Sequence, residues 1–246
     1  MIEKGYTIPV LDKGYCRLVD WLGTDQRIVE AARVSYKSPS KGEVEDKKLL
    51  HYLFKNRHTS PFEQCSIVYN IKLPLFVQGQ FVRHRTQKLN QMSARYTEMP
   101  DEFYIPKSWR AQDKKNKQGS VEGSNWNPKI DREYFDAGLM GDGWNDILAT
   151  EALSDFCEQS YDLYQKMIDA GIAKEMARMI LPQNLYTEIY TQFDLHNLMH
   201  LFRLRLDPHA QWEIRQYAQA IYDIFKELYP WCAEAYEKYK FELVEV

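Results

Sequence analysis

The clearest hydrophobic pattern in the chain lies between residues 65 and 73. Apolar side chains alternate there with mostly polar ones, at Cys65, Ile67, Tyr69, Ile71 and Leu73. A period of two places these five on one face, so the pattern predicts a β-strand with one buried side. Weaker alternation indicates a second long strand over 186–193, a strand-like opening over 10–22 and a short strand over 103–106.

Apolar residues at helical spacing occur on both sides of these strands. They predict helices over 26–35, 44–55, 151–170, 173–180, 195–206 and 211–228. Pro74 can open another helix, because the first helical position needs no N–H. That helix should run through Gln80 and deliver Arg83 and His84 at its C-terminal end. Helices and strands mixed in this order, with no repeat or dividing linker, favour one α+β domain over residues 1–246.

Composition supports a globular protein and excludes some classes. The 246 residues are 44% hydrophobic and 27% charged, with a net charge of −3. No apolar run approaches the length of a membrane span, and the N-terminus lacks the core of a signal peptide. Four widely spaced cysteines indicate reduced thiols, so we expect a cytoplasmic protein with no membrane partner. The polar segment 109–126 predicts a mobile surface loop that could serve as a lid.

A basic stretch over residues 83–96 follows an apolar segment. It holds three arginines, a histidine and a lysine, and no acidic residue. Arginine suits phosphate, because its planar fork donates two parallel hydrogen bonds. A solvated basic loop is the alternative, but Leu89, Met92 and Tyr96 interleave with the charge and favour a packed anion site. The net negative charge of the chain argues against a nucleic-acid partner.

A second polar concentration covers residues 194–209. His196 and His200 are four apart and share a helix face, and with His209 they could form a three-histidine metal site. The acidic residue that usually accompanies such a pair is missing, so hydrogen bonds to a ligand or to the backbone are the favoured role. We expect no metal.

Three arginines raise the question of a buried charge. Arg203 and Arg205 are two apart on a predicted helix and face different ways, so one should be exposed and the other should point inward with His200. Arg178 lies in the apolar setting 176–182. Each could belong to a structural salt bridge, but together they favour a shared anionic ligand.

Common catalytic signatures are absent. The chain has no GxSxG, P-loop or GxGxxG motif, and no cysteine lies in the arginine or histidine clusters. If the protein is an enzyme, its reactive electrons therefore belong to a cofactor.

Several separated motifs point to one family. Arg83-His84-Arg85 is followed by Asn90, Ser93, Arg95 and Tyr96, and further motifs occur at 31–35, 58–63, 177–182, 194–200 and 205–213. In this order and spacing they resemble the signature of flavin-dependent thymidylate synthases (the ThyX family), over nearly the whole chain.

The resemblance implies the fold and the reaction. It implies one catalytic domain with a central antiparallel sheet packed by helices, assembled as a homotetramer with sites shared between subunits. The implied enzyme is a methyltransferase that makes dTMP from dUMP. It takes carbon from 5,10-methylenetetrahydrofolate and hydride from FAD that NADPH has reduced.

The resemblance also implies the site residues. Those expected to bind FAD are Ser60, Arg83, His84, Arg85, Gln91, Asp194, Leu195, His196 and His200. Those expected to bind dUMP are Gln80, Phe81, Val82, Arg83, Gln91, Met92, Ser93, Ala94, Arg95, Arg178 and Arg205. Arg205 is the expected catalytic residue, because a guanidinium at the pyrimidine favours deprotonation of N3 and makes C5 a better nucleophile. Ser93 has no evident base to activate it, so we assign it to substrate hydrogen bonding.

Two positions depart from the family pattern. Lys88 stands where serine is common, and Gln91 stands where glutamate is common. Gln91 keeps an acceptor oxygen but loses a carboxylate, which bears on flavin positioning and on uracil preference. Three alternatives stay open: a related methylase or hydroxymethylase of another pyrimidine nucleotide such as UMP, a non-catalytic nucleotide- or RNA-binding protein, and a three-histidine metalloenzyme.

Overall fold

The computed structural model describes residues 2–117, 119–130 and 146–240. Its contacts group the chain into two compact units. The first unit holds Met1–Leu73, Val77–Met92 and Glu188–Val246, and the second holds Pro74–Phe76 and Ser93–Thr187. Each unit is described by itself. Among the described residues, no helix is both long and apolar enough to cross a membrane.

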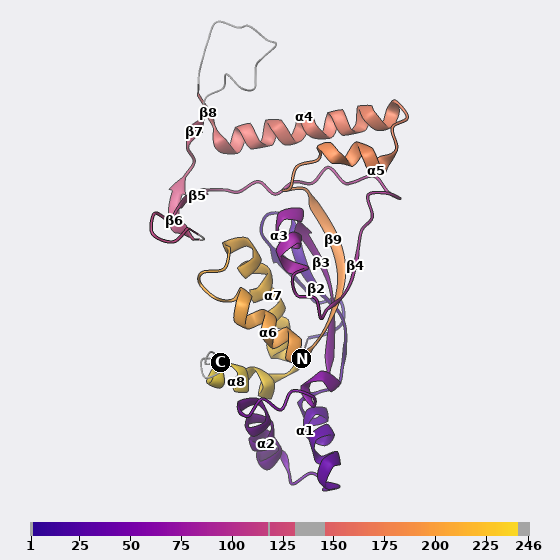
Figure 1. Ribbon diagram of the computed structural model, residues 1–246, viewed down its shortest axis with the longest axis vertical. Helices are drawn as coiled ribbons and strands as arrows, with labels where there is room; N and C mark the ends of the chain where they lie inside the picture. Colours follow the sequence, from indigo (N-terminus) through magenta and orange to yellow (C-terminus); the bar gives the residue numbers. More distant parts are fainter. Residues whose placement is uncertain (1, 118, 131–145, 241–246) are drawn as a thin grey trace, which may run out of the picture. The chain divides into compact units, whose positions relative to one another are not determined.

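A five-stranded sheet forms the centre of the first unit. Its order is β1-β2-β3-β9-β4, and the strands are β1 (Thr7–Val10), β2 (Gly14–Leu22), β3 (Ser66–Pro74), β9 (Tyr186–Asp194) and β4 (Lys88–Gln91) (Figure 1). The pairs β1–β2, β2–β3 and β4–β9 are antiparallel. The alternation in β3 works as predicted, because Ile67, Tyr69, Ile71 and Leu73 are fully buried.

Six described helices lie between or after these strands in the chain. They are α1 (Asp25–Arg33), α2 (Glu43–Lys55), α3 (Leu75–Phe81), α6 (Leu195–Arg205), α7 (Trp212–Leu228) and α8 (Pro230–Tyr239), with short 3₁₀ turns η1 (Val34–Tyr36) and η2 (Phe62–Gln64). The apolar side of α7 packs on β1 and β2, where the Tyr217 hydroxyl donates to the Lys72 carbonyl at 2.8 Å. The carboxylate of Asp25 accepts from the backbone N–H groups of Trp231 (2.9 Å) and Cys232 (3.1 Å), and so caps the first turn of α8.

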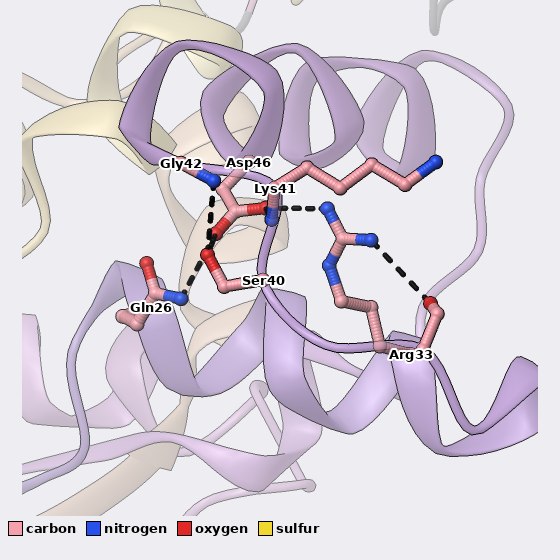
Figure 2. Close-up of polar contacts among 7 residues, drawn as sticks. Gln26, Arg33, Ser40, Lys41, Gly42 and Asp46 are labelled. Carbon is pink, nitrogen blue, oxygen red and sulfur yellow. Dashed lines mark hydrogen bonds and ion pairs between the residues drawn. The ribbon is translucent and has the colours of Figure 1, made fainter.

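A buried carboxylate joins α1 to α2 (Figure 2). Asp46, on α2, is fully buried and pairs with the guanidinium of Arg33 at the end of α1. It also accepts from the Ser40 hydroxyl (2.5 Å) and the Gln26 amide (3.1 Å). Burial alone would raise the pKa of Asp46, but the hydrogen bonds outweigh it and hold that pKa below its ordinary value. The cluster fixes the direction in which α2 leaves the 38–42 turn.

The second unit is built on a long helix. It contains α4 (Ala149–Asp169), α5 (Lys174–Ala177), the 3₁₀ turn η4 (Arg178–Ile180), and short strands β5 (Trp109–Gln112), β6 (Ser120–Trp126), β7 (Lys129–Ile130) and β8 (Ile147–Leu148). The Ser160 hydroxyl of α4 donates to the Ile180 carbonyl at 2.7 Å, which ties η4 to α4. The Tyr161 hydroxyl donates to the Met99 carbonyl at 2.9 Å.

The predicted α+β fold with an antiparallel sheet is confirmed, and the predicted helices are present with small shifts at their ends, except that 173–180 divides into α5 and the 3₁₀ turn η4. The predicted strand over 103–106 is wrong, since only one isolated bridge joins Phe103 to Leu185. The segment 109–126 contains the paired strands β5 and β6 and is not a structureless loop. Its mobility, and a single domain over 1–246, stay predictions.

Candidate active site

The turn after α3 carries the Arg83-His84-Arg85 motif. Gln87 holds this turn in place, because its amide donates to the Phe81 carbonyl at 2.9 Å and its oxygen accepts from the Thr191 hydroxyl at 2.7 Å. Thr191 lies on β9, which pairs with β4 immediately after the turn. The motif is therefore tied to the end of α3 on one side and to the central sheet on the other, and α3 delivers it where the sequence predicted.

Arg205 reaches this motif from the last turn of α6. Its Nε donates to His84 Nε2 at 3.0 Å, and its Nη2 donates to the Gln80 carbonyl at 3.4 Å. The side chain of His84 is buried, with 7% of the residue exposed. The two predicted residues lie 121 positions apart in sequence and form one hydrogen-bonded pair.

The surroundings of His84 and Arg205 favour a neutral imidazole beside a charged guanidinium. Burial, followed by the charge of Arg205 and by His200, lowers the pKa of His84 to about 4. A neutral imidazole leaves Nε2 as an acceptor when its proton is on Nδ1, which matches the donated N–H of Arg205. Burial also lowers the pKa of Arg205, which still remains a cation at neutral pH.

A hollow of about 400 Å³ opens beside this pair. Six residues predicted from the sequence line it together: Arg83, His84, Arg85, His196, His200 and Arg205. The hollow therefore brings most of the expected flavin residues next to the expected catalytic arginine.

A second hollow, of about 240 Å³, shares His196 and His200 with the first. Its other lining residues are Leu53, Phe54, Arg57, His58, Thr59, Phe62, Met199, Arg203 and Tyr236. None of these nine was among the predicted site residues. The signal available for His58 and Thr59 was their place in the 58–63 motif, and Arg57 directly precedes it.

The two arginines at the end of α6 divide as expected. Arg203 is exposed and Arg205 is only partly exposed. Arg205 and His200 line the same hollow, as expected for the inward arginine. Their hydrogen-bond partners differ, since Arg203 contacts His200 Nδ1 at 3.2 Å whereas Arg205 donates to His84.

Three predicted flavin residues have other local contacts. Asp194 caps α6, accepting from the Asn197 N–H at 2.9 Å and the Asn197 amide at 2.7 Å. The side chain of Leu195 is fully buried in the core. Ser60 is exposed and directly follows Thr59, which lines the smaller hollow.

Glutamine amides connect other predicted residues. The Gln78 amide donates to Gln91 Oε1 at 2.9 Å, and the Gln80 amide donates to Gln211. Gln211 in turn donates to Glu213 Oε2 at 2.9 Å.

The remaining predicted dUMP residues of this unit flank these amides. Phe81 is fully buried, whereas 36% of Val82 is exposed. The backbone N–H of Met92 donates to the Glu188 carbonyl at 2.9 Å.

The other predicted dUMP residues lie in the second unit. Arg95 Nε donates to Glu175 Oε2 at 2.8 Å, and Arg178 Nε donates to the Glu175 carbonyl at 3.2 Å. Both arginines therefore meet at one residue of α5. The expected inward setting of Arg178 is wrong, because it is exposed and its neighbour Met179 is 71% exposed. Ala94 is buried, and the Ser93 hydroxyl accepts from the Arg95 N–H at 3.3 Å.

The donor set of the first unit fits a phosphate-bearing flavin cofactor. Arg83 and Arg85 supply guanidinium groups at the larger hollow, which suit a diphosphate. The smaller hollow combines apolar side chains with imidazoles, which suits a flat heterocycle. Among the described residues, no three histidine, cysteine, aspartate or glutamate side chains are placed to hold a metal ion.

Comparison with known proteins agrees with this geometry. The family described as thymidylate synthase complementing protein matches residues 17–231. A flavin-dependent thymidylate synthase of Thermus thermophilus is 46% identical over 241 residues, covering 98% of this chain and 82% of the relative. One from Treponema denticola is 43% identical over 233 residues, covering 94% of this chain and 82% of the relative.

A solved structure is similar over nearly the same length. The UMP/dUMP methylase PolB from Streptomyces cacaoi, bound with 5-Br UMP, is 29% identical with a TM-score of 0.76, covering 94% of this chain and 97% of its own. The resemblance carried by the sequence motifs is thus confirmed: the chain belongs to the thymidylate synthase complementing protein family.

Proposed function

We propose that this protein is a flavin-dependent thymidylate synthase. It is a methyltransferase that converts dUMP to dTMP, with 5,10-methylenetetrahydrofolate as carbon donor, FAD as cofactor and NADPH as reductant. The family match and the names of relatives that cover nearly the whole chain support this function. The observation that carries it is the larger hollow, where the basic motif of α3 and the histidines of α6 gather around Arg205.

We assign the flavin to the two adjoining hollows. Arg83 and Arg85 would bind its diphosphate, and His84, His196 and His200 would contact it from the shared wall. Asp194 would act through its cap, because it fixes the first turn of α6 on which His196 lies. Ser60, Leu195 and Gln91 complete the proposed flavin set. The chemistry that FAD supplies when bound is hydride transfer.

We assign dUMP to the arginines and the glutamine amides. Arg83, Arg95 and Arg178 would take its phosphate, while Gln80, Gln91 and Ser93 would hydrogen-bond its polar groups. Phe81, Val82, Met92 and Ala94 would shape the surface along which it lies.

Arg205 would contact the pyrimidine ring. Its guanidinium stabilises negative charge on N3 and on the adjoining carbonyl oxygens, which increases electron density at C5. His84 and the Gln80 carbonyl hold the guanidinium in one orientation before substrate arrives, so little reorganisation is needed during the reaction.

The function is tested by a flavin assay coupled to product analysis. The protein loaded with FAD is mixed anaerobically with NADPH, with and without dUMP, and then given methylenetetrahydrofolate. We expect the flavin absorbance to bleach at a rate that dUMP alters, and dTMP to appear. Flavin that binds and is reduced without any methylated product would contradict the proposed reaction.

A second pyrimidine nucleotide is the competing substrate. The solved relative is named a UMP/dUMP methylase, and Gln91 replaces the glutamate common in the family. Parallel assays with UMP and dUMP distinguish the readings. We expect dUMP to be preferred, and a higher kcat/KM for UMP would reassign the enzyme.

We also propose a homotetramer whose sites are shared between subunits, located in the cytoplasm. Large apolar side chains on the surface of each unit support further association, among them Tyr190 (51% exposed) and Tyr96 (80% exposed). The four cysteines are buried and form no disulfide within the described chain, which suits a reducing compartment. Light scattering on the purified protein tests the assembly.

A further inference from the structure

An open groove of about 570 Å³ runs along α2 and α8, which pack side by side in the first unit (Figure 1). The charged residues that line it, apart from His51, are four lysines and two glutamates, a surplus of two positive charges in a chain whose net charge is −3. The lysines are Lys47, Lys48, Lys55 and Lys238. We call this feature the lysine groove. None of the roles proposed above uses it.

Aromatic rings organise two of the cations. Lys55 Nζ lies 5.6 Å and Lys238 Nζ 5.3 Å from the centre of the Tyr239 ring. The Tyr239 ring therefore lies near an ammonium group from each helix. A cation–π contact directs no N–H donor toward an acceptor oxygen, so it is compatible with hydrogen bonds to an anionic ligand.

One ionisable side chain of the groove is largely buried. His51 lines the groove with 12% of its side chain exposed, and its Nε2 is 3.5 Å from Glu234 Oε1. Burial lowers the pKa of His51, and Lys238 and Lys47 lower it further although Glu234 opposes them. The lowered pKa favours the neutral imidazole, so the charge of the groove comes from its lysines and glutamates.

The lysine groove adjoins the smaller hollow of the active site. Tyr52 of the groove stacks on His58 of the hollow, with ring centres 6.0 Å apart and planes at 28°. Tyr239 of the groove and Phe54 of the hollow lie 6.3 Å apart. The hollow and the groove are thus joined by aromatic contacts that involve side chains of α2 and α8.

We propose that the lysine groove binds the anionic tail of a co-substrate whose ring system reacts beside the flavin assigned to the adjoining hollow. The inference rests on the proposed function, because that reaction uses two molecules of this shape. A reduced folate carries glutamate carboxylates behind its ring, and NADPH carries phosphates. Lysines on flexible stems suit acceptor groups spaced along a mobile chain, since each ammonium is a movable point charge.

The test removes three positive charges from the groove and compares the effect on KM with the effect of removing three positive charges elsewhere in the same unit. The groove variant is K48Q/K55Q/K238Q. It keeps Lys47, whose ammonium joins α2 to α8 through Glu234 at 2.5 Å. The matched control is K4Q/K13Q/K226Q, which removes three exposed lysines of the same unit. For each protein, KM is measured for dUMP, for NADPH and for methylenetetrahydrofolate with one and with three glutamates.

We expect the native enzyme to favour the triglutamate folate and the groove variant to lose that preference. Its KM for the triglutamate should rise about tenfold, from three partly exposed charge contacts, while KM for dUMP stays the same. The control should keep native values. A rise in KM confined to NADPH would support binding in the groove and identify phosphates as the bound tail.

Two results would overturn the proposal alone. They are KM values within twofold of native for every co-substrate, or equal increases in the groove variant and the control. Native enzyme that forms no dTMP with any folate would instead overturn the proposed function, and the groove proposal with it. The groove variant therefore tests the groove proposal, whereas the native enzyme tests the proposed reaction.

Discussion

Arg205 owes its orientation to a residue 121 positions away in the chain. His84 presents a lone pair from Nε2, and Arg205 donates Nε–H to it, so the guanidinium cannot rotate without losing a buried hydrogen bond. The basic motif on α3 therefore does more than supply cations. One of its members sets the direction of the charge on which the proposed catalysis depends.

Two replacements of Arg205 distinguish the effect of its positive charge from the effect of its planar shape. We expect Arg205→Ala to keep FAD but to lose at least about a hundredfold in kcat, the usual loss when a preorganised donor to developing charge is removed. Arg205→Lys should recover only part of this, because an ammonium cannot reproduce the planar fork. Both are measured by dTMP formation and by flavin absorbance. Native kcat in the alanine variant would remove Arg205 from the mechanism.

His84 should make stability depend on pH. Its folded pKa of about 4 lies below the unfolded value of 6.5, so between these values the unfolded chain binds more protons. Its contribution to stability is fully present above pH 6.5 and is lost as pH falls toward 4, by about 3 kcal/mol in total. In His84→Gln, an amide oxygen can accept from Arg205 without titrating.

The measurement for His84 is urea unfolding at several pH values. We expect the slope of unfolding free energy between pH 6.5 and 4 to be smaller in His84→Gln than in native protein. His209→Gln, at an exposed site, is the control and should keep the native slope. Equal slopes in all three proteins would show that His84 does not titrate in this window.

Among the elements, β2 depends on a glycine at its first residue. A Cβ added at Gly14 would lie 2.1 Å from the Tyr217 hydroxyl and 2.7 Å from the Lys72 carbonyl. These two groups are hydrogen-bonded to each other and join α7 to β3. There is no room for a methyl group without moving one of these elements.

Gly14→Ala should therefore destabilise the protein by about 1–3 kcal/mol, the usual cost of overpacking. Gly79→Ala is the matched control, because nothing lies within 4 Å of its added Cβ and it lies inside α3. Helix propensity predicts that this control gains up to about 1 kcal/mol. Thermal or urea unfolding of the two variants shows whether Gly14→Ala lowers the unfolding free energy while Gly79→Ala raises it.

The Arg33–Asp46 pair is the corresponding contact between α1 and α2. Removing Arg33 leaves a buried carboxylate without its cation, which typically costs about 3–5 kcal/mol. We expect Arg33→Ala to unfold at lower urea and to bind FAD more weakly, because α2 supplies Leu53 and Phe54 to the smaller hollow. Lys166→Ala breaks an exposed pair and should change stability by less than about 1 kcal/mol.

Elements with strong periodicity were predictable, and those held by backbone pairing were not. The alternation of β3 and the apolar stripe of α7 identify both from side chains alone. β4 falls inside the basic stretch, where Lys88, Asn90 and Gln91 give no apolar signal, and only its pairing with β9 makes it a strand. β5 and β6 are likewise polar strands that pair with each other.

α8 was also missed, although Pro230 at its first turn and buried Cys232 and Tyr236 suit a helix. Its N-terminus is capped by Asp25, from the opposite end of the sequence. A cap of that kind has no local signature in the chain.

The candidate site was likewise predictable in part from the sequence and in part only from the fold. The motifs identified which residues gather, and the larger hollow contains six of them. Their mutual contacts came only from the fold, because the bond between His84 and Arg205 depends on where α3 and α6 end. The exposure of Arg178 was likewise hidden, since its apolar neighbours Met176 and Met179 are themselves more than half exposed.

For the whole molecule, the open question is which subunit supplies each arginine. The proposed dUMP set takes Arg205 from the first unit and Arg178 from the second. We predict that the shared sites of the tetramer take these two residues from different subunits. Single variants Arg205→Ala and Arg178→Ala would then each damage every site in their own homotetramers.

Mixing the two variants tests this arrangement. When they are unfolded and refolded together, random assembly would restore native residues in about a quarter of the sites. We therefore expect dTMP formation to return toward a quarter of the native rate, although each parent is weak alone. Native mass spectrometry verifies that mixed tetramers have formed. Mixed tetramers with no recovered activity would mean that one subunit supplies both arginines, because random pairing would then leave every site with one defect.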